Sequence, residues 1–188
     1  MDLGLIIFIV VMVILLILLF FIIGTYNALV DLRNRVSDQW AQIDVQLKMR
    51  ADLIPNLVET VKGYASHERE TLDAVIQARS NFQNATTPEA EMQAAGELTQ
   101  VLGRLFALAE AYPDLKANQN FIQLQTTLNG IEEKIAFARQ FYNDSVLTYK
   151  NKLEMFPSNI IAGMFKFEPK TFFEVEAGQR EVPNISFK

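Results

Sequence analysis

The chain has 188 residues, a length that allows one compact domain together with a membrane anchor. It has no cysteine and one histidine, His67, which excludes disulfides and thiolate metal sites and disfavours histidine-dependent catalytic triads. Its net charge of −5 at pH 7 provides no basic surface for nucleic acid. We therefore expect no metal, no cofactor and no nucleic acid partner.

The N-terminal part of the chain is a long apolar stretch. Residues 3–23 contain no charged side chain. About 20 apolar residues in a helix, at roughly 1.5 Å per residue, match the ~30 Å hydrocarbon core of a bilayer. A helix also pairs its own backbone groups, as lipid requires. We therefore predict an anchor within residues 1–25, and the membrane-spanning helix includes Leu3, Ile6, Ile9, Leu16, Phe20 and Ile23.

A cleaved signal peptide is the alternative interpretation of the same stretch. Such a peptide has a basic start, a shorter apolar core and a cleavage site of small residues. This chain begins Met-Asp-Leu, its apolar stretch is longer than that core, and no Ala-x-Ala pattern follows Ile23. These features favour an anchor that is retained.

The charges that flank the apolar stretch predict its orientation. Arg33 and Arg35 follow it closely, whereas no lysine or arginine precedes it. Basic residues are enriched on the cytoplasmic side of membrane spans. We expect a single-pass protein of the inner (cytoplasmic) membrane, with its N-terminus outside and its large domain in the cytoplasm.

Residues 26–156 carry apolar side chains at helical spacing. Steps of three and four residues predict helices that pack on one another, and the sustained repeat is typical of coiled-coil packing. The fold class is therefore all-α. After the transmembrane helix we predict an antiparallel up-and-down four-helix bundle with long first and last helices. The positions that carry this pattern in the first helix are Val36, Trp40, Ile43, Leu47, Ile54, Leu57, Val61 and Tyr64.

Glycine and proline suggest where the helices end. Gly63 favours an end to the first helix, although the apolar periodicity would also allow one helix as far as Asn84. Thr87 followed by Pro88 predicts a helix that begins at the proline, with the threonine as its N-cap. The last helix is expected to end at Phe156, because Pro157 follows it.

Arg50 falls on the apolar face of the first helix. A buried, unpaired charge costs several kcal/mol, so this side chain needs a carboxylate partner. Asp144 or Glu133 of the last helix could supply it, and we single out Arg50 and Asp144 as the candidate buried ion pair. The alternative is that the arginine extends past the apolar face to water. Glu132 and Glu133, adjacent on a helix, are assigned to a solvated face.

Residues 157–188 differ from the rest in their prolines, glycines and many phenylalanines, and are predicted to form an irregular, aromatic C-terminal tail. Phenylalanine rings are too apolar to remain in water in such number. One interpretation is an extended strap across the bundle. The other is a short helix over residues 160–165 that rests on the membrane or on a neighbouring subunit.

Several segments, in order along nearly the whole chain, resemble the LemA family of bacterial membrane proteins. They are YNALV at residues 26–30, WAQIDVQL at 40–47, RADLIPNLV at 50–58, VKGYA at 61–65, YPDLKA at 112–117, IAFAR at 135–139, YND at 142–144 and FPSNIIA at 156–162. The resemblance implies one N-terminal span, a cytoplasmic four-helix bundle and no enzymatic activity. Relatives have been connected with membrane stress, membrane-protein quality control and membrane shaping, and the resemblance supplies no site residues.

Two functions follow from this as hypotheses. The first is a non-enzymatic, membrane-anchored scaffold of the LemA type that forms a homo-oligomer and organises or remodels the lipid bilayer. The second is an adaptor or sensor for a membrane protein partner, such as a quality-control peptidase. A hydrolase hidden in the bundle is disfavoured by the residue composition.

Overall fold

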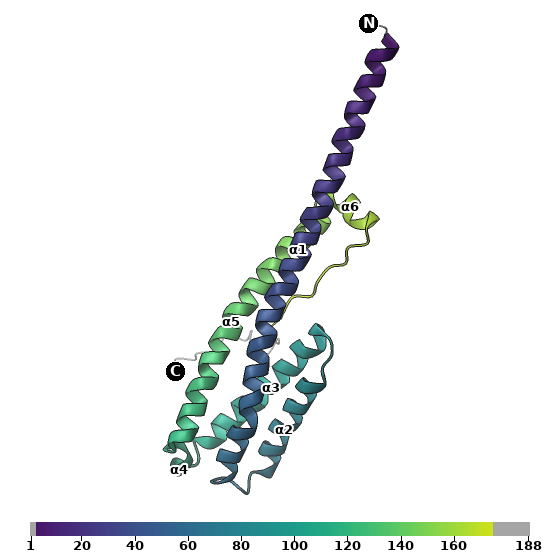
Figure 1. Cartoon of the computed structure of the whole chain (residues 1–188). Helices are drawn as coiled ribbons and strands as arrows, with labels where there is room; N and C mark the ends of the chain where they lie inside the picture. The colour runs from purple at the N-terminus through teal and green to yellow at the C-terminus, as the bar shows by residue number, and fades with distance from the viewer. Residues whose placement is uncertain (1–2, 175–188) are drawn as a thin grey trace, which may run out of the picture. The chain divides into compact units, whose positions relative to one another are not determined.

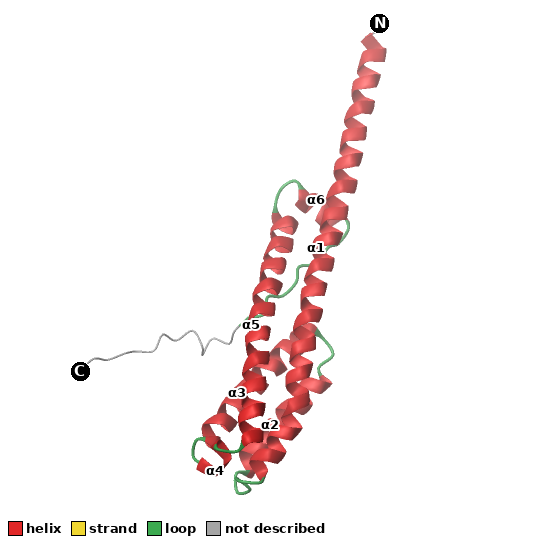
Figure 2. Ribbon diagram, turned by 60° about the vertical axis from the view of Figure 1, so that its left-hand side comes forward, coloured by secondary structure: helices red, strands yellow, loops and turns green. Residues whose placement is uncertain are grey.

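The computed structural model describes residues 3–174, and all the regular structure in that range is helical (Figures 1 and 2). Contacts divide these residues into two units: unit 1 comprises residues 3–39 and 141–172, and unit 2 comprises residues 40–140 and 173–174. The helices are α1 (Leu3–Lys62), α2 (Arg69–Asn84), α3 (Pro88–Ala109), α4 (Pro113–Lys116), α5 (Gln119–Glu154) and α6 (Ser158–Met164).

These units differ from the predicted segments 1–25, 26–156 and 157–188. The long helices α1 and α5 each contribute to both units. Residues 157–172, which the sequence assigned to a separate tail, belong to unit 1. The predicted tail beyond Glu174, which includes Phe187, lies outside the described residues.

One buried apolar core joins the helices of unit 2, in which α2 and α3 lie side by side (Figure 1). Each helix contributes residues at steps of three or four, so a single face of each is buried. The members with no exposed surface are Ile54, Leu57 and Val61 of α1, Val75 of α2, Leu98 and Leu105 of α3, and Leu115 of α4, and α5 adds Phe121 and Leu128. This core sets the positions of the polar groups described below.

The helix ends in unit 2 follow the glycine and proline signals closely. The break near Gly63 is confirmed, since α1 ends at Lys62 and α2 begins at Arg69. Thr87 is confirmed as the N-cap of α3, where the Ala90 amide donates to Thr87 Oγ1 at 3.2 Å. The last long helix, α5, ends at Glu154, two residues before the predicted end.

Unit 1 consists of the first part of α1, the end of α5, α6, a turn at residues 165–166 and a strap over residues 167–172. Tyr142 and Tyr149 of α5 fix the strap: their hydroxyls donate to the carbonyls of Thr171 at 2.8 Å and Glu168 at 3.1 Å. A short helix is therefore present, over Ser158–Met164 and not over 160–165, and a strap follows it; contact of the helix with the membrane or a neighbouring subunit stays a prediction.

Thr87 provides a test of how α3 begins. Replacing it with alanine removes the acceptor of the Ala90 amide, so Thr87→Ala should lower the free energy of unfolding by about 1 kcal/mol. Thr87→Ser keeps a hydroxyl and should lose much less. Urea unfolding of the full chain in detergent, followed by circular dichroism, measures both. Equal losses in the two variants would show that the cap does not stabilise the helix.

Candidate functional site

The first candidate functional feature is the apolar part of α1. Among the described residues, α1 is the one helix long and apolar enough to cross a membrane, and its most apolar window has no buried residue in the structure. The core helix of a soluble protein would bury at least one face. The predicted membrane-spanning residues are all exposed: Leu3, Ile6, Ile9, Leu16, Phe20 and Ile23.

The second candidate feature is a charged group in the core of unit 2. Arg50 of α1 is 1% exposed. Its Nη1 donates to Glu132 Oε1 of α5 and to Thr99 Oγ1 of α3, both at 2.8 Å. Its Nη2 donates to the Ala95 carbonyl of α3 at 3.0 Å, whereas Nε is buried with no hydrogen-bond partner. One guanidinium thereby ties three helices together.

The partner of Arg50 is Glu132, so the predicted pairing with Asp144 is wrong. The side chain of Glu132 is 40% exposed, so water reaches one side of a bond whose other side is buried. The assignment of Glu132 to a solvated face is only partly right, because its side chain is partly exposed and also pairs with the buried Arg50. The sequence did indicate that Glu132 borders the apolar face of α5. Glu132 lies four residues after Leu128 and three before Ile135, and both of these residues are buried.

Arg139 shares the electrostatic environment of this pair. Burial lowers the pKa of the Arg139 guanidinium, the carboxylate of Glu132 opposes that shift, and the charge of Arg50 adds to it. Two guanidinium groups therefore act on one carboxylate. Arg139 also lies over the ring of Phe173, with 4.4 Å between its Cζ and the ring centroid. The arrangement is suited to holding helices in register.

A second charged cluster in unit 2 was not foreseen from the sequence. Lys48 Nζ donates to Asp44 Oδ2 at 2.6 Å within α1. Asp44 Oδ1 and Glu91 Oε2 are buried without a hydrogen-bond partner. Burial raises the pKa of Glu91, and the charge of Asp44 raises it further, while Lys48 acts in the opposite direction. Asp44 and Lys48 lie one turn apart on α1, whereas Glu91 lies on α3 and is far away in sequence, so spacing along the chain gave no signal for its approach.

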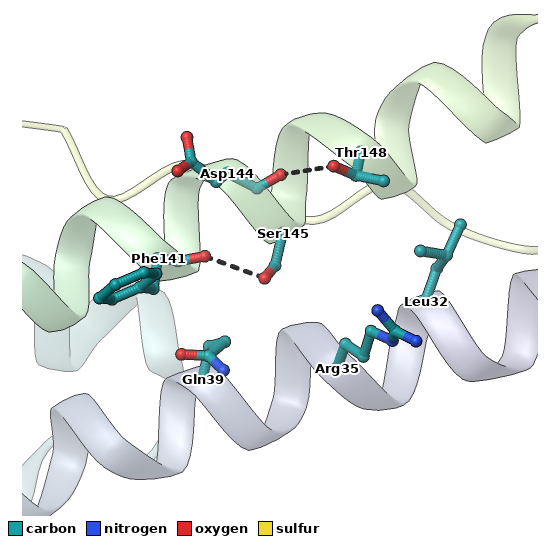
Figure 3. Close-up of a pocket in the computed structure, with 7 residues that line it drawn as sticks. All are labelled: Leu32, Arg35, Gln39, Phe141, Asp144, Ser145 and Thr148. Atoms are coloured by element: carbon teal, nitrogen blue, oxygen red, sulfur yellow. Dashed lines mark hydrogen bonds between the residues drawn. The ribbon is translucent and has the colours of Figure 1, made fainter.

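Asp144 instead lines a small pocket in unit 1, of about 180 Å³ (Figure 3). Ser145 and Thr148 also line it, and their hydroxyls donate to the carbonyls of Phe141 and Asp144 on their own helix. Pockets for drug-sized ligands are usually 300 Å³ or larger and carry polar groups that converge on the ligand. The small volume does not indicate a ligand site, and neither do the two hydroxyls, since both are already bonded to backbone carbonyls of α5. Its other lining residues are Leu32, Arg35, Gln39 and Phe141.

The Arg50 pair is tested by removing its carboxylate. Glu132→Ala leaves a buried guanidinium without its counter-charge, so it should lower the free energy of unfolding by about 2 kcal/mol or more. The neighbouring exposed Glu133→Ala should change it by less than about 0.5 kcal/mol. Urea unfolding in detergent measures both. Equal effects would show that the pair contributes nothing specific, and the double variant Arg50→Met/Glu132→Leu should recover most of the loss.

Glu91 makes stability depend on pH in a predictable direction. A raised carboxyl pKa means that the folded state holds the proton more tightly than the unfolded state. The stabilising contribution of Glu91 is therefore complete below its ordinary pKa of 4.5 and is lost as pH rises through the folded-state pKa. Glu91→Gln should consequently become more stable relative to wild type as pH rises from about 4 to about 7.

The control for this experiment is Glu89→Gln, an exposed carboxyl in the same helical turn. Thermal unfolding of both variants and wild type across that pH range provides the comparison. The expected gain with pH appears in Glu91→Gln alone. A gain of the same size in the Glu89 variant would assign the effect to net charge instead of to burial of Glu91.

Comparisons with known proteins place this helical arrangement in a family. The model of the LemA family matches residues 39–187. Protein LemA of Metamycoplasma hominis is 26% identical over 141 residues, which cover 74% of this chain and 64% of that protein. The match thus spans somewhat less than two thirds of that relative's length.

Similarity extends to proteins with another name. Magnetosome protein MamQ of Magnetospirillum gryphiswaldense is 23% identical over 184 residues, which cover 84% of this chain and 68% of that protein. Magnetosome protein MamQ 2 of Paramagnetospirillum magneticum is 22% identical over 175 residues, covering 79% and 64% respectively. The family match includes α2 to α6 and the part of α1 that enters unit 2. Because that match covers most of the sequence, the chain belongs to the LemA family.

Proposed function

We propose that this protein is a non-enzymatic, membrane-anchored helical scaffold that self-associates and organises or remodels the membrane. The observation that carries the proposal is the exposed apolar stretch of α1, which continues without interruption into the helical core of unit 2. The apolar stretch and the residues that enter that core thus belong to one helix, α1. No flexible linker separates the two within α1.

The free energy of transferring apolar side chains from water to lipid favours insertion of the anchor. Each leucine, isoleucine, valine or phenylalanine in a helix favours insertion by about 0.3–0.6 kcal/mol near the bilayer centre. Residues 3–23 consist almost entirely of these types, so the total is on the order of 5–10 kcal/mol. The same side chains are exposed in the structure, which makes lipid the environment that suits them.

The orientation follows from the flanking charges. Arg33 and Arg35 lie roughly 15 Å or more beyond Ile23 along α1, at about 1.5 Å per residue, and hold basic charge on that side. We place the domain in the cytoplasm and the span in the inner membrane. In this arrangement α1, α2, α3 and α5 act as an antiparallel four-helix bundle, supported by the core they share.

Self-association is supported by apolar side chains on the surface of unit 2. Val45 and Met49, one turn apart on α1, are each about half exposed. Phe137 of α5 is 65% exposed. Large apolar side chains at an exposed position commonly mark interaction surfaces when they gather on one face. Val45 and Met49 lie on one face of α1, because they are four residues apart.

The same side chains also support a second candidate function, an adaptor or sensor for a membrane enzyme such as a quality-control peptidase. The two functions differ in the molecule that covers Val45 and Met49. In a scaffold it is a second copy of this chain, and in an adaptor it is another protein. A catalytic role is not part of either proposal, because the chain has no cysteine and a single histidine.

The mass of the purified full chain in detergent separates the two. A scaffold gives a defined oligomer of the 21.4 kDa chain, measured by light scattering after size exclusion. Val45→Ser/Met49→Ser should shift that oligomer toward the monomer, because it removes the apolar pair. Ile76→Ser, at an equally exposed position on α2, is the matched control and should leave it intact. A wild-type chain that is monomeric at all concentrations would reject the scaffold.

A further inference from the structure

Helix α6 is apolar on two opposite faces. Ile161 and Ala162 are buried in unit 1. Ile160 and Met164, four residues apart and thus on one face, are 53% and 64% exposed. A face of a helix that carries large apolar side chains is normally covered by another part of the protein or by a partner. Unit 1 covers one side of α6 and leaves the other open.

The exposed face continues into the turn that precedes α6. Met155 is 61% exposed and Phe156 is 81% exposed, the largest exposed fraction of any large apolar side chain in the described residues. Figures 1 and 2 show this turn and α6 beside α1, at the end of unit 1 from which the apolar stretch of α1 leaves. We call the four exposed side chains, Met155, Phe156, Ile160 and Met164, the α6 patch.

The level of the α6 patch relative to the anchor can be worked out from α1. The ring of Phe165, directly after α6, packs edge-on against Tyr26 of α1, with 4.8 Å between centroids. Tyr26 is three residues beyond Ile23, a rise of about 4.5 Å. The polar layer of a bilayer leaflet extends about 5–8 Å beyond the hydrocarbon core. Tyr26 and the ring that it contacts therefore lie at headgroup depth if α1 spans the membrane.

The burial of α1 agrees with this level. Every large apolar residue of α1 up to Phe21 is exposed, and the first buried residues are Thr25 and Leu29. Unit 1 thus begins to cover α1 within one turn of the end of the apolar stretch. Lys166, exposed beside Phe165, adds a basic group of the kind that favours anionic headgroups.

We propose that the α6 patch inserts into the polar–apolar boundary of the leaflet next to α1, as a second membrane contact. Lipid is the occupant because Phe165, which follows Met164 of the patch directly, packs against Tyr26, three residues beyond the end of the apolar stretch of the anchor. Short apolar segments with an aromatic residue and a flanking lysine bind at this depth. The inference rests on the proposed anchor and adds to it that unit 1 is held against the bilayer surface.

Fluorescence of single tryptophans in the full chain tests this. Trp40 is the one tryptophan, and Trp40→Phe keeps a ring beside Phe173, so it serves as the background. Three tryptophans are then introduced separately: Phe156→Trp in the patch, Phe20→Trp in the span and Phe137→Trp on exposed α5 of unit 2. Each protein is reconstituted into phosphatidylcholine–phosphatidylglycerol vesicles that contain lipid brominated either near the headgroup or near the chain ends. Circular dichroism confirms that each is folded.

The expected result is that Phe156→Trp loses most of its emission to bromine near the headgroup, Phe20→Trp to bromine near the chain ends, and Phe137→Trp to neither. Quenching of Phe20→Trp without quenching of Phe156→Trp would overturn the second contact and leave the anchor intact. Absence of quenching at Phe20→Trp would instead reject the anchor. A third outcome is that bromine does not quench Phe156→Trp, but its emission shifts to the blue as the protein-to-lipid ratio rises. That result would assign the patch to a second copy of the chain and overturn the lipid contact.

Discussion

Two physical demands act on a single helix in this protein: the first part of α1 exposes apolar side chains throughout, while its last part is buried in a core shared with α2, α3, α4 and α5. Apolar side chains in this density leave water for lipid, and a helix can enter lipid because its backbone groups are already paired. Since α1 is continuous from Leu3 to Lys62, the element that satisfies the first demand also organises the folded unit.

Polar groups hold the folded part in register. Arg50 is almost wholly buried, and its hydrogen bonds to Glu132, Thr99 and Ala95 connect three helices. A buried charge contributes little net stability but strongly disfavours packings in which it would lose its partner. In unit 1 the hydroxyls of Tyr142 and Tyr149 have a related role, since each fixes the strap by one carbonyl. The exposed face of α6 is followed directly by Phe165, whose ring contacts Tyr26 of α1 just beyond the apolar stretch.

The sequence predicted the features that depend on local chemistry. Thr87 before Pro88 defined the start of α3, Gly63 separated α1 from α2, and the long apolar stretch identified the candidate span. It failed where the result depends on which helix faces lie opposite one another. Asp144 and Glu132 have the same chemistry and lie on the same helix, and only the packed arrangement shows that Glu132 meets Arg50. The strap likewise follows from tyrosine hydroxyls whose distant acceptors no periodicity reveals.

The proposed function requires that residues 3–23 remain in the chain and lie within lipid. Washing membranes that contain the full chain with alkaline carbonate removes peripheral proteins and leaves integral ones, and the intact mass of the retained protein shows whether its N-terminal stretch is present. We expect the protein to stay in the membrane fraction and to keep residues 3–23. Release into the wash, or a retained species that lacks those residues, would contradict it.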